Sequence, residues 1–208
     1  MEKLIKRGAE AEIYLAKWRG RKAIIKRRIA KKYRIKEIDD DIREKRTKKE
    51  ALMLAGARRA GVSAPIIYDL RIENSEIVMQ YIEGERLKDK LDFKKEDEQM
   101  EICRKIGEGI SRLHSDGIIH GDITTSNLIL FDDKIYFIDF GLSSRSEEIE
   151  DMGVDLHLLM EAFKSAHKNK NLFKWVREAY IKFFDRGEEV IEKIKEIERR
   201  GRYMRKVT

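Results

Sequence analysis

Several residue types are scarce in this 208-residue chain, and each shortage limits what the protein can be. The single cysteine, Cys103, stands on the apolar face of a predicted helix, so we expect a small core residue in a reducing cytosol. Glutamine occurs at two positions, while Lys, Arg, Glu and Ile are abundant, a bias typical of ion-pair-rich thermophile proteins. No apolar run approaches membrane-spanning length, and the first residues lead directly into a predicted strand. We therefore expect a cytoplasmic protein without signal peptide or membrane anchor.

Apolar and charged residues each make up 41% of the chain, which favours a soluble globular protein over a disordered one. At this length the chain can bury one sizeable core or form two small lobes of a single unit. The formal net charge of +7 points toward a polyanionic partner, although it also serves solubility. Basic residues fill seven of eleven positions at 26–36 and five of eight at 199–206. Each run is either a solvated face or a surface for phosphate-backbone contacts.

Phosphoryl-transfer chemistry is indicated by two motifs with an apolar, strand-like run between them. The first, His-Gly-Asp-Ile-Thr-Thr-Ser-Asn at 120–127, places Asp122 and Asn127 five positions apart, and the second is Asp-Phe-Gly at 139–141. This chemistry needs a carboxylate beside the attacking oxygen, and an amide oxygen and a second carboxylate to hold the magnesium that neutralises the phosphates. Asp-Phe-Gly alone is a weak signal. Together, in this order, the motifs indicate descent from kinases.

The first part of the chain, residues 1–83, is predicted to be the small lobe of a kinase. A helix over 35–60 is expected to present Ile35, Ile38 and Ile42 on one face, which Leu54 continues. An α+β domain unrelated to kinases is the alternative, but the downstream motifs argue against it. A five-stranded antiparallel sheet is expected from short β-type runs at 2–6, 12–17, 22–28, 66–70 and 76–81.

A lysine and a glutamate are expected to clamp the phosphates of ATP. Lys26 ends the run Ala-Ile-Ile-Lys, which matches the kinase strand whose lysine contacts the α- and β-phosphates. Two acids on the predicted helix, Glu44 and Glu50, are candidates for its partner. Glu50 lies one turn before Leu54 on the apolar face, so we expect it to face the sheet and pair with Lys26. Glu44 lies among basic residues and is better explained by ion pairs in solvent.

The loop expected to cover the phosphates retains one glycine. Gly8, Ala9 and Ala11 permit close backbone approach, whereas Glu10 would bring negative charge near the phosphates. Alone, this segment is a poor nucleotide-binding motif that is compatible with a plain hairpin, and its position upstream of Lys26 is what favours ATP binding.

The hinge and the larger lobe follow. The backbone around Gln80 and Ile82 is expected to meet the adenine edge, and residues 84–208 to form a reduced, mostly helical C-lobe. His114 and His120 are expected to be structural residues that support the catalytic loop. Asp155 is either the buried acid that anchors the backbone of this loop or a simple helix-start carboxylate. Helices are predicted around 103–116, 151–166, 172–184 and 188–200.

The segment after Asp-Phe-Gly is short. Sixteen positions separate Asp139 from Asp155, without the Ala-Pro-Glu motif of a protein kinase activation segment. Gly121 stands in place of the arginine that would read a phosphorylated activation loop. Slow ATP turnover or self-phosphorylation is therefore favoured over efficient protein phosphorylation, with Ser143 and Ser144 as the expected self-acceptors.

On the motif at 120–127, the loop at 8–11, the short activation segment and Arg-Gly-Arg at 200–202, the chain resembles a family of atypical kinases. This is the archaeal-type small kinase/ATPase subunit of the KEOPS (EKC) complex, the PRPK-like family, and the resemblance covers essentially the whole chain. It implies a minimal two-lobed kinase fold. It also implies support, by ATP hydrolysis or autophosphorylation, for threonylcarbamoyladenosine formation in tRNA.

The resemblance also implies roles for individual residues. Asp122 is then the catalytic base, Lys26 and Glu50 are the phosphate clamp, and Asn127 and Asp139 hold Mg²⁺ with ATP. The implied partners are the threonylcarbamoyltransferase subunit, other KEOPS subunits, and tRNA bound through the basic loop and tail. We expect the tail to become ordered only on a partner. Its candidate tRNA-binding residues are Arg199, Arg200, Arg202, Arg205 and Lys206.

Three other functions share part of this pattern. A RIO-like kinase in ribosome maturation is disfavoured by the intact Asp-Phe-Gly and by the lack of a phosphate loop rich in Ser and Gly. A small-molecule phosphotransferase normally needs a larger substrate lobe than the C-terminal half offers. A pseudokinase scaffold would bind nucleotide without turning it over.

Overall fold

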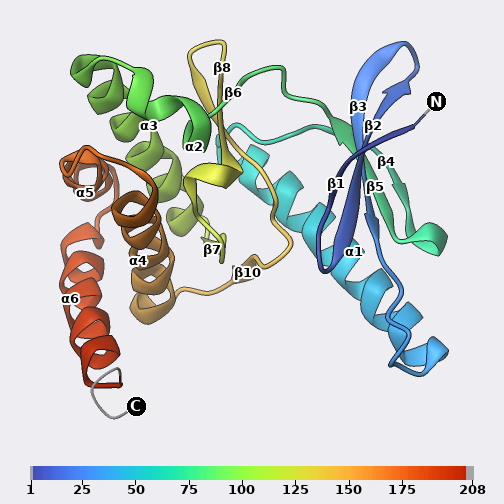
Figure 1. Ribbon diagram of the computed structural model, residues 1–208. Helices are drawn as coiled ribbons and strands as arrows, with labels where there is room; N and C mark the ends of the chain where they lie inside the picture. The colour runs from blue at the N-terminus through green and yellow to red at the C-terminus, as the bar shows by residue number, and fades with distance from the viewer. Residues whose placement is uncertain (1, 205–208) are drawn as a thin grey trace.

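The computed structural model describes residues 2–204, with side chains through residue 200. Within this range a sheet with one long helix is followed by a mostly helical part, and the two occupy opposite sides of the view (Figure 1). The arrangement confirms the expected α+β, kinase-like fold.

The N-terminal sheet has five strands within the described residues, in the order β1-β2-β3-β5-β4. Every neighbouring pair is antiparallel, and helix α1, Lys36–Arg59, connects β3 to β4. The predicted strands are confirmed, with ends shifted by at most one residue. They are β1 Lys3–Arg7, β2 Ala11–Trp18, β3 Arg21–Arg28, β4 Ile67–Arg71 and β5 Glu76–Gln80.

Strand β3 presents its side chains to two different layers. Ala23 and Ile25 are buried in a small apolar cluster on one face of the sheet. Because successive side chains of a strand point to opposite faces, Lys26 and Arg28 both lie on the other face, toward α1. The strand therefore delivers two cations to the same helix.

Helix α1 buries a different face from the one its isoleucines predict. Ile35 and Ile38 are 67% and 53% exposed, so that prediction is wrong at the start of the helix. The buried face instead begins with Asp39 and continues through Glu50 and Leu54. The spacing of these residues keeps them on one side of the helix, and the side is chosen by ion pairs as much as by apolar contacts.

The C-terminal part is built on four long helices within the described residues. Gly107 of α3 permits close packing of α5, because a Cβ atom there would lie 2.4 Å from the carbonyl oxygen of Val176. None of these described helices has the length and apolarity needed to cross a bilayer. The helices are α3 Glu96–Ser115, α4 Ile149–Ala166, α5 Leu172–Phe183 and α6 Gly187–Met204.

Short strands and turns fill the space between the sheet and these helices. Strands β6, β8 and β9 form one small sheet, and β10 pairs with β7. The hairpin of β8 and β9 lies between the two predicted catalytic motifs, as expected. The bounds are β6 Glu85–Arg86, α2 Leu87–Lys90, β7 Ile118–Ile119, β8 Leu128–Phe131, β9 Lys134–Phe137 and β10 Ser144–Arg145, with single 3₁₀ turns at Ile72–Asn74, Leu91–Phe93 and Thr125–Asn127.

Helix α6 extends further than predicted. Its backbone is helical to Met204, so the expectation that the tail needs a partner for order is wrong for residues 199–204. Ion pairs fasten this end to α4, since Arg200 lies 2.5 Å from Glu150 and Glu198 lies 3.0 Å from Lys164. The side chain of Arg202, and Arg205 and Lys206 altogether, lie outside what the structure describes.

One apolar core connects the two parts. Leu54 of α1 and Ile77 of β5 belong to the same buried cluster as Leu113 of α3 and Phe140 of the Asp-Phe-Gly motif. Cys103 is fully buried in this cluster, and burial raises the pKa of its thiol to about 12. Its predicted role as a core residue is confirmed.

Candidate active site

Three charged side chains from distant parts of the chain meet between β3, α1 and the end of β9. Lys26 Nζ donates to Glu50 Oε1 at 2.6 Å and to Asp139 Oδ1 at 2.7 Å. Glu50 is 1% exposed and Lys26 9%, whereas the Asp139 side chain is 45% exposed and open to a ligand. The structure pairs Lys26 with Glu50 rather than with Glu44, which contacts Lys48 in solvent.

The electrostatics of this cluster keep its members charged. Burial opposes the charge of Lys26, but the Glu50 and Asp139 carboxylates outweigh it and raise the pKa of Lys26 above its ordinary value. Burial also opposes the charge of Asp139 and would raise the pKa of its carboxyl. The Lys26 ammonium outweighs burial, so this pKa is lowered. A cation and an anion are therefore both present at neutral pH.

The glycine of Asp-Phe-Gly lies directly against this cluster. A Cβ atom at Gly141 would lie 3.1 Å from Asp139 Oδ1 and 3.3 Å from Lys26 Nζ. A side chain here would intrude on the space in which the two charges contact each other. Both charged atoms would have to shift by a few tenths of an ångström to admit it.

The catalytic-loop pair is also in direct contact. Asn127 Nδ2 donates to the carboxylate of Asp122 at 2.8 Å and to its backbone oxygen at 3.0 Å. Both side chains are partly buried at the beginning and the end of the loop that precedes β8. Because the amide nitrogen faces Asp122, the amide oxygen of Asn127 is directed elsewhere, as a metal ligand requires.

Asp155 anchors the backbone of the catalytic loop, which decides between its two predicted interpretations. It lies within α4 and is fully buried, with Oδ2 accepting from His120 N at 2.7 Å and Oδ1 from Gly121 N at 2.8 Å. The helix-start interpretation is wrong. Gly121 has φ of +79°, and a Cβ atom there would lie 2.7 Å from the oxygen of Leu142, so no arginine fits at this position.

The two histidines are structural, as predicted. His120 is fully buried and accepts from the backbone nitrogen of Asp122 at 3.3 Å through Nδ1. Burial lowers its pKa and keeps the ring neutral. His114 contacts Asp155 at 3.4 Å and the hydroxyl of Tyr180 at 2.7 Å. Both buried rings therefore make contacts that stabilise the catalytic loop.

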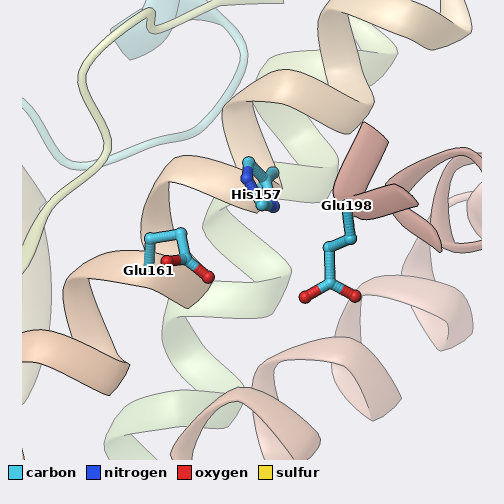
Figure 2. A group of neighbouring side chains, drawn as sticks. All are labelled: His157, Glu161 and Glu198. Carbon is cyan, nitrogen blue, oxygen red and sulfur yellow. The ribbon is translucent and has the colours of Figure 1, made fainter. Parts of the chain in front are cut away.

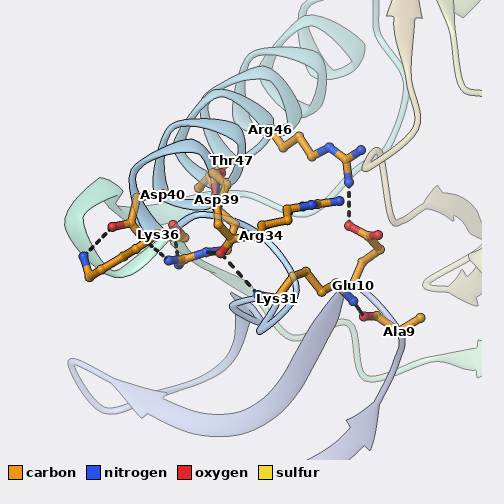
Figure 3. Close-up of polar contacts among 11 residues, drawn as sticks. Ala9, Glu10, Lys31, Arg34, Lys36, Asp39, Asp40, Arg46 and Thr47 are labelled. Atoms are coloured by element: carbon orange, nitrogen blue, oxygen red, sulfur yellow. Dashed lines mark hydrogen bonds and ion pairs between the residues drawn. The ribbon is translucent and has the colours of Figure 1, made fainter.

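The loop between β1 and β2 is tied to its surroundings rather than left open (Figure 3). Gly8 N donates to Ala11 O at 2.9 Å and closes the turn, and Ile29 N donates to Glu10 O at 3.1 Å. The Glu10 carboxylate, expected near the phosphates, contacts Arg46 of α1 at 2.5 Å. Lys31 Nζ donates to the backbone oxygen of Ala9.

Much of the basic run at 26–36 is engaged inside the chain. Figure 3 shows Arg34 and the backbone of Lys31 directed at Asp39, which is 3% exposed. Arg43 Nε also donates to Asp39 at 2.8 Å, which fixes the connection between β3 and α1. These contacts hold part of the run in place, and the prediction that its exposed members bind RNA stays a prediction. Its members with internal partners are Lys26, Arg27, Arg28, Lys31, Arg34 and Lys36.

The expected hinge follows β5. Gln80 pairs across the sheet with Ala23 of β3, and its backbone nitrogen donates to Ile66 O at 2.8 Å. Ile82 is 6% exposed. Gly84 packs against β8 so closely that a Cβ atom would lie 2.3 Å from Leu130 O, which brings the segment down onto the C-terminal part.

The two expected self-acceptors differ in access. Ser143 is 1% exposed and its hydroxyl donates to Phe140 O at 2.6 Å, so a phosphate cannot reach it without opening this turn. This placement argues against Ser143 as an acceptor. Ser144 is partly exposed in β10, opposite Ile119 of β7.

Arg28 is a residue of this site that the sequence reasoning missed. Its Nη2 donates to Glu50 Oε2 at 2.6 Å, and its side chain is 6% exposed. In the sequence it is one of several basic residues in a run. The available signal was its spacing of two from Lys26, which places both on one face of a strand.

The donor set fits a hard divalent cation. Asn127 and Asp139 offer an amide oxygen and a carboxylate oxygen, the ligand types that such cations prefer. The partial exposure of Asp139 leaves room for water and phosphate ligands, which usually complete the coordination.

A separate group with metal-ligand chemistry lies on α4 and α6 (Figure 2). His157, Glu161 and Glu198 have ligand atoms within 4.8 Å of one another, and they are the only such group of His, Cys, Asp and Glu among the described residues. The ammonium of Lys164 lies 2.9 Å from Glu161 and 3.0 Å from Glu198. A cation of the chain itself therefore already bridges the two carboxylates.

The fold and the Lys26–Glu50 pair place the chain among protein-kinase-type phosphotransferases, which use ATP with a divalent metal. Comparison with known families agrees, because the protein kinase domain matches residues 1–165. Among solved structures, the Mycobacterium tuberculosis protein Rv3197 in complex with erythromycin has a TM-score of 0.54 and 16% identity. That likeness covers 76% of this chain and 50% of the other, and it shows the fold alone.

Curated relatives narrow the class to one family. The KEOPS complex subunit Bud32 of Pyrococcus abyssi is 48% identical, over 97% of this chain and 96% of the relative. A probable serine/threonine-protein kinase BUD32 homolog of Archaeoglobus fulgidus is 43% identical, with 97% and 96% covered. The chain belongs to the Bud32 family of protein kinases. It also covers 36% of a 45% identical probable bifunctional tRNA threonylcarbamoyladenosine biosynthesis protein of Methanothermobacter thermautotrophicus, about a third of that protein's length.

Proposed function

We propose that this chain is the ATP-hydrolysing kinase subunit of a KEOPS complex, and that it supports threonylcarbamoyladenosine formation in tRNA. The family membership supports the assignment, since relatives carry the KEOPS and threonylcarbamoyladenosine names. The observation that carries the activity is the contact of Lys26 with both Glu50 and Asp139, since this brings the phosphate clamp and the metal ligand together. We assign the protein to the cytoplasm, where tRNA modification and a reduced Cys103 are compatible.

Each site residue then has one task. Lys26, held by Glu50, contacts the α- and β-phosphates, and the loop of Gly8, Ala9, Glu10 and Ala11 covers them. The backbone around Gln80 and Ile82 meets the adenine. Mg²⁺, when bound, neutralises charge that develops on the phosphates.

The catalytic loop supplies the rest of the chemistry. Asp122 accepts the proton of the attacking hydroxyl or water, and its contact with Asn127 keeps the carboxylate oriented. Asn127 directs its amide oxygen and Asp139 its carboxylate to the metal. Asp155 holds the loop in register from below.

The short segment after Asp-Phe-Gly favours water or a residue of this complex as acceptor. After Gly141 the chain enters β10, which pairs with β7 beside the catalytic loop, and α4 begins at Ile149. No stretch of chain remains between them for a peptide-docking shelf. Of the two candidate self-acceptors, the exposure of Ser144 makes it the one to test.

The central experiment is ATP turnover by the purified chain, with and without tRNA and the transferase subunit. Asp139→Ala is expected to lower phosphate release about a hundredfold or more, because it removes a metal ligand. Asp185→Ala, an exposed carboxylate between α5 and α6, is the matched control and should retain wild-type turnover. Undiminished turnover in Asp139→Ala would refute the site. Nucleotide binding without turnover in any mixture would instead identify a pseudokinase scaffold.

The tRNA contact is assigned to the end of α6, where Arg199 and Arg200 are exposed. Together with Arg202, Arg205 and Lys206 they concentrate positive charge at the C-terminus, and Arg200 remains 60% exposed although it pairs with Glu150. Removal of residues 199–208 should weaken tRNA binding and flatten its dependence on salt, because fewer counterions are released. The double variant Arg199→Gln, Arg200→Gln tests charge without shortening the chain. A salt dependence equal to that of the wild type in both variants would contradict this surface.

A further inference from the structure

Glu50 is held by two cations. Lys26 contacts its Oε1 atom at 2.6 Å and Arg28 contacts its Oε2 atom at 2.6 Å. All three side chains are buried, with exposures of 9%, 6% and 1% for Lys26, Arg28 and Glu50. Both oxygens of the carboxylate are thus satisfied by separate donors, which the single lysine could not achieve.

The second cation changes what happens when ATP and its metal arrive. Lys26 is shared between Glu50 and Asp139, and if Asp139 were to ligate a metal and Lys26 to contact phosphates, their mutual contact would have to loosen. With Lys26 as its sole partner, the buried Glu50 would then compete with the phosphates for that ammonium. Arg28 donates to Glu50 Oε2, so the buried negative charge of Glu50 still has a cationic partner when Lys26 contacts the phosphates.

Arg28 also fixes the helix that carries Glu50. Its Nη2 atom lies 3.4 Å from the backbone oxygen of Arg46, one turn before Glu50 on α1. In protein kinases the lysine–glutamate pair is controlled by the activation loop and by the position of this helix. Here the segment from Gly141 to Ile149 is too short to do so, and a buried strand residue connects sheet and helix instead.

We propose that Arg28 is a positioning residue for ATP: it holds Glu50, and through it Lys26, in the geometry that binds the phosphates, without need of a regulatory segment. The inference rests on the proposed ATP-dependent function. Lys26 contacts phosphates that are not transferred, so Arg28 supports binding equally in the ground state and the transition state. Its loss should therefore raise KM for ATP more than it lowers kcat.

The test compares Arg28→Met, Arg28→Lys and Arg27→Met by steady-state ATP turnover, well below the melting temperature of each variant. Arg28→Met is expected to raise KM for ATP about tenfold, the size of one lost charged hydrogen bond, and to lower kcat less than about threefold. Arg28→Lys keeps a cation near Glu50 and should recover part of the loss. Arg27 points to the opposite face and pairs with Glu76, so Arg27→Met is the matched control and should keep the wild-type KM.

A double-mutant cycle tests whether Arg28 acts through Glu50. In a Glu50→Gln background, adding Arg28→Met should change KM by less than about twofold, since Glu50→Gln already removes the negative charge with which Arg28 pairs. A tenfold further change would overturn the inference. So would a folded Arg28→Met variant with the wild-type KM. If Arg28→Met does not fold, Arg28→Lys is the deciding variant. A wild-type KM in Arg28→Lys would show that the contact of the guanidinium with Glu50 is not needed for ATP binding.

The same measurements separate an error in the role of Arg28 from an error in the proposed ATP-dependent function. If ATP turnover is absent or insensitive to Asp139→Ala, the function itself is wrong. If turnover depends on Asp139 and the Arg28 variants retain the wild-type KM, the function stands and the role of Arg28 is wrong.

Discussion

Replacing Asp155 by alanine removes the anchor of the catalytic loop, and the cost can be worked from its contacts. Two backbone donors lose their acceptor: His120 N, whose contact at 2.7 Å is buried, and Gly121 N, whose contact at 2.8 Å is partly buried. His114 Nε2 also loses a longer contact at 3.4 Å. An unsatisfied buried donor costs about 1–3 kcal/mol, so one buried and one partly buried donor together give a loss of about 3 kcal/mol in the free energy of unfolding. For a chain of this length that corresponds to a fall of about 10 °C in Tm.

The same substitution should reduce catalysis. Asp122 lies next to the anchored pair, and a displacement of about 1 Å in a reacting group costs about a hundredfold in rate. We expect kcat for ATP turnover to fall by about that factor while the nucleotide still binds, because Lys26 and Glu50 do not contact Asp155. Urea unfolding measures the first effect, and turnover combined with nucleotide titration measures the second.

Two further variants separate the loss of the anchoring contacts from the general effect of removing a carboxylate from α4. Asp155→Asn keeps one acceptor oxygen but directs an amide group at the second backbone donor, so about half of the stability loss should remain. Asp151→Ala, on the exposed side of the same helix, removes only a contact with Ser146 at 2.6 Å and should change stability by less than about 0.5 kcal/mol. Equal unfolding free energies for the Asp155 and Asp151 variants would refute the anchoring argument.

Two further predictions concern charge. Because the folded-state pKa of Asp139 is lowered, the stability it contributes is present above the ordinary aspartate pKa and is lost as pH falls through the folded value. Below about pH 4 the wild type should therefore lose unfolding free energy more steeply than Asp139→Asn, as measured by denaturation at several pH values, and parallel curves would contradict it. Arg46→Ala frees the Glu10 carboxylate beside the expected phosphate position and should raise KM for ATP about threefold at low salt, with the effect shrinking as salt is added. The double variant with Glu10→Ala should return KM to the wild-type value; a KM that stays raised would show that the charge of Glu10 is not the cause.

The sequence by itself predicted the strands, the kinase class and the candidate site residues. Strand-length apolar runs predicted the five-stranded sheet, because alternating burial and turn residues are local properties. Helical spacing selected Glu50 over Glu44, since Glu50 and Leu54, four positions apart, lie on the same side of a helix whichever side is buried. The spacing of Asp122, Asn127 and Asp139 indicated phosphoryl transfer before any coordinates.

The tertiary structure decided what the partners of these residues are. Asp155 had two equal interpretations because its contact with His120 spans 35 positions, a distance that no local pattern encodes. Arg28 looked like one charge in a basic run, and it became a site residue because packing of α1 on β3 brought Glu50 within 2.6 Å. Ser143 looked accessible until the turn after Asp-Phe-Gly buried its hydroxyl. Periodicity assigns a side chain to a face of its element, and only the packing of distant elements determines what that face meets.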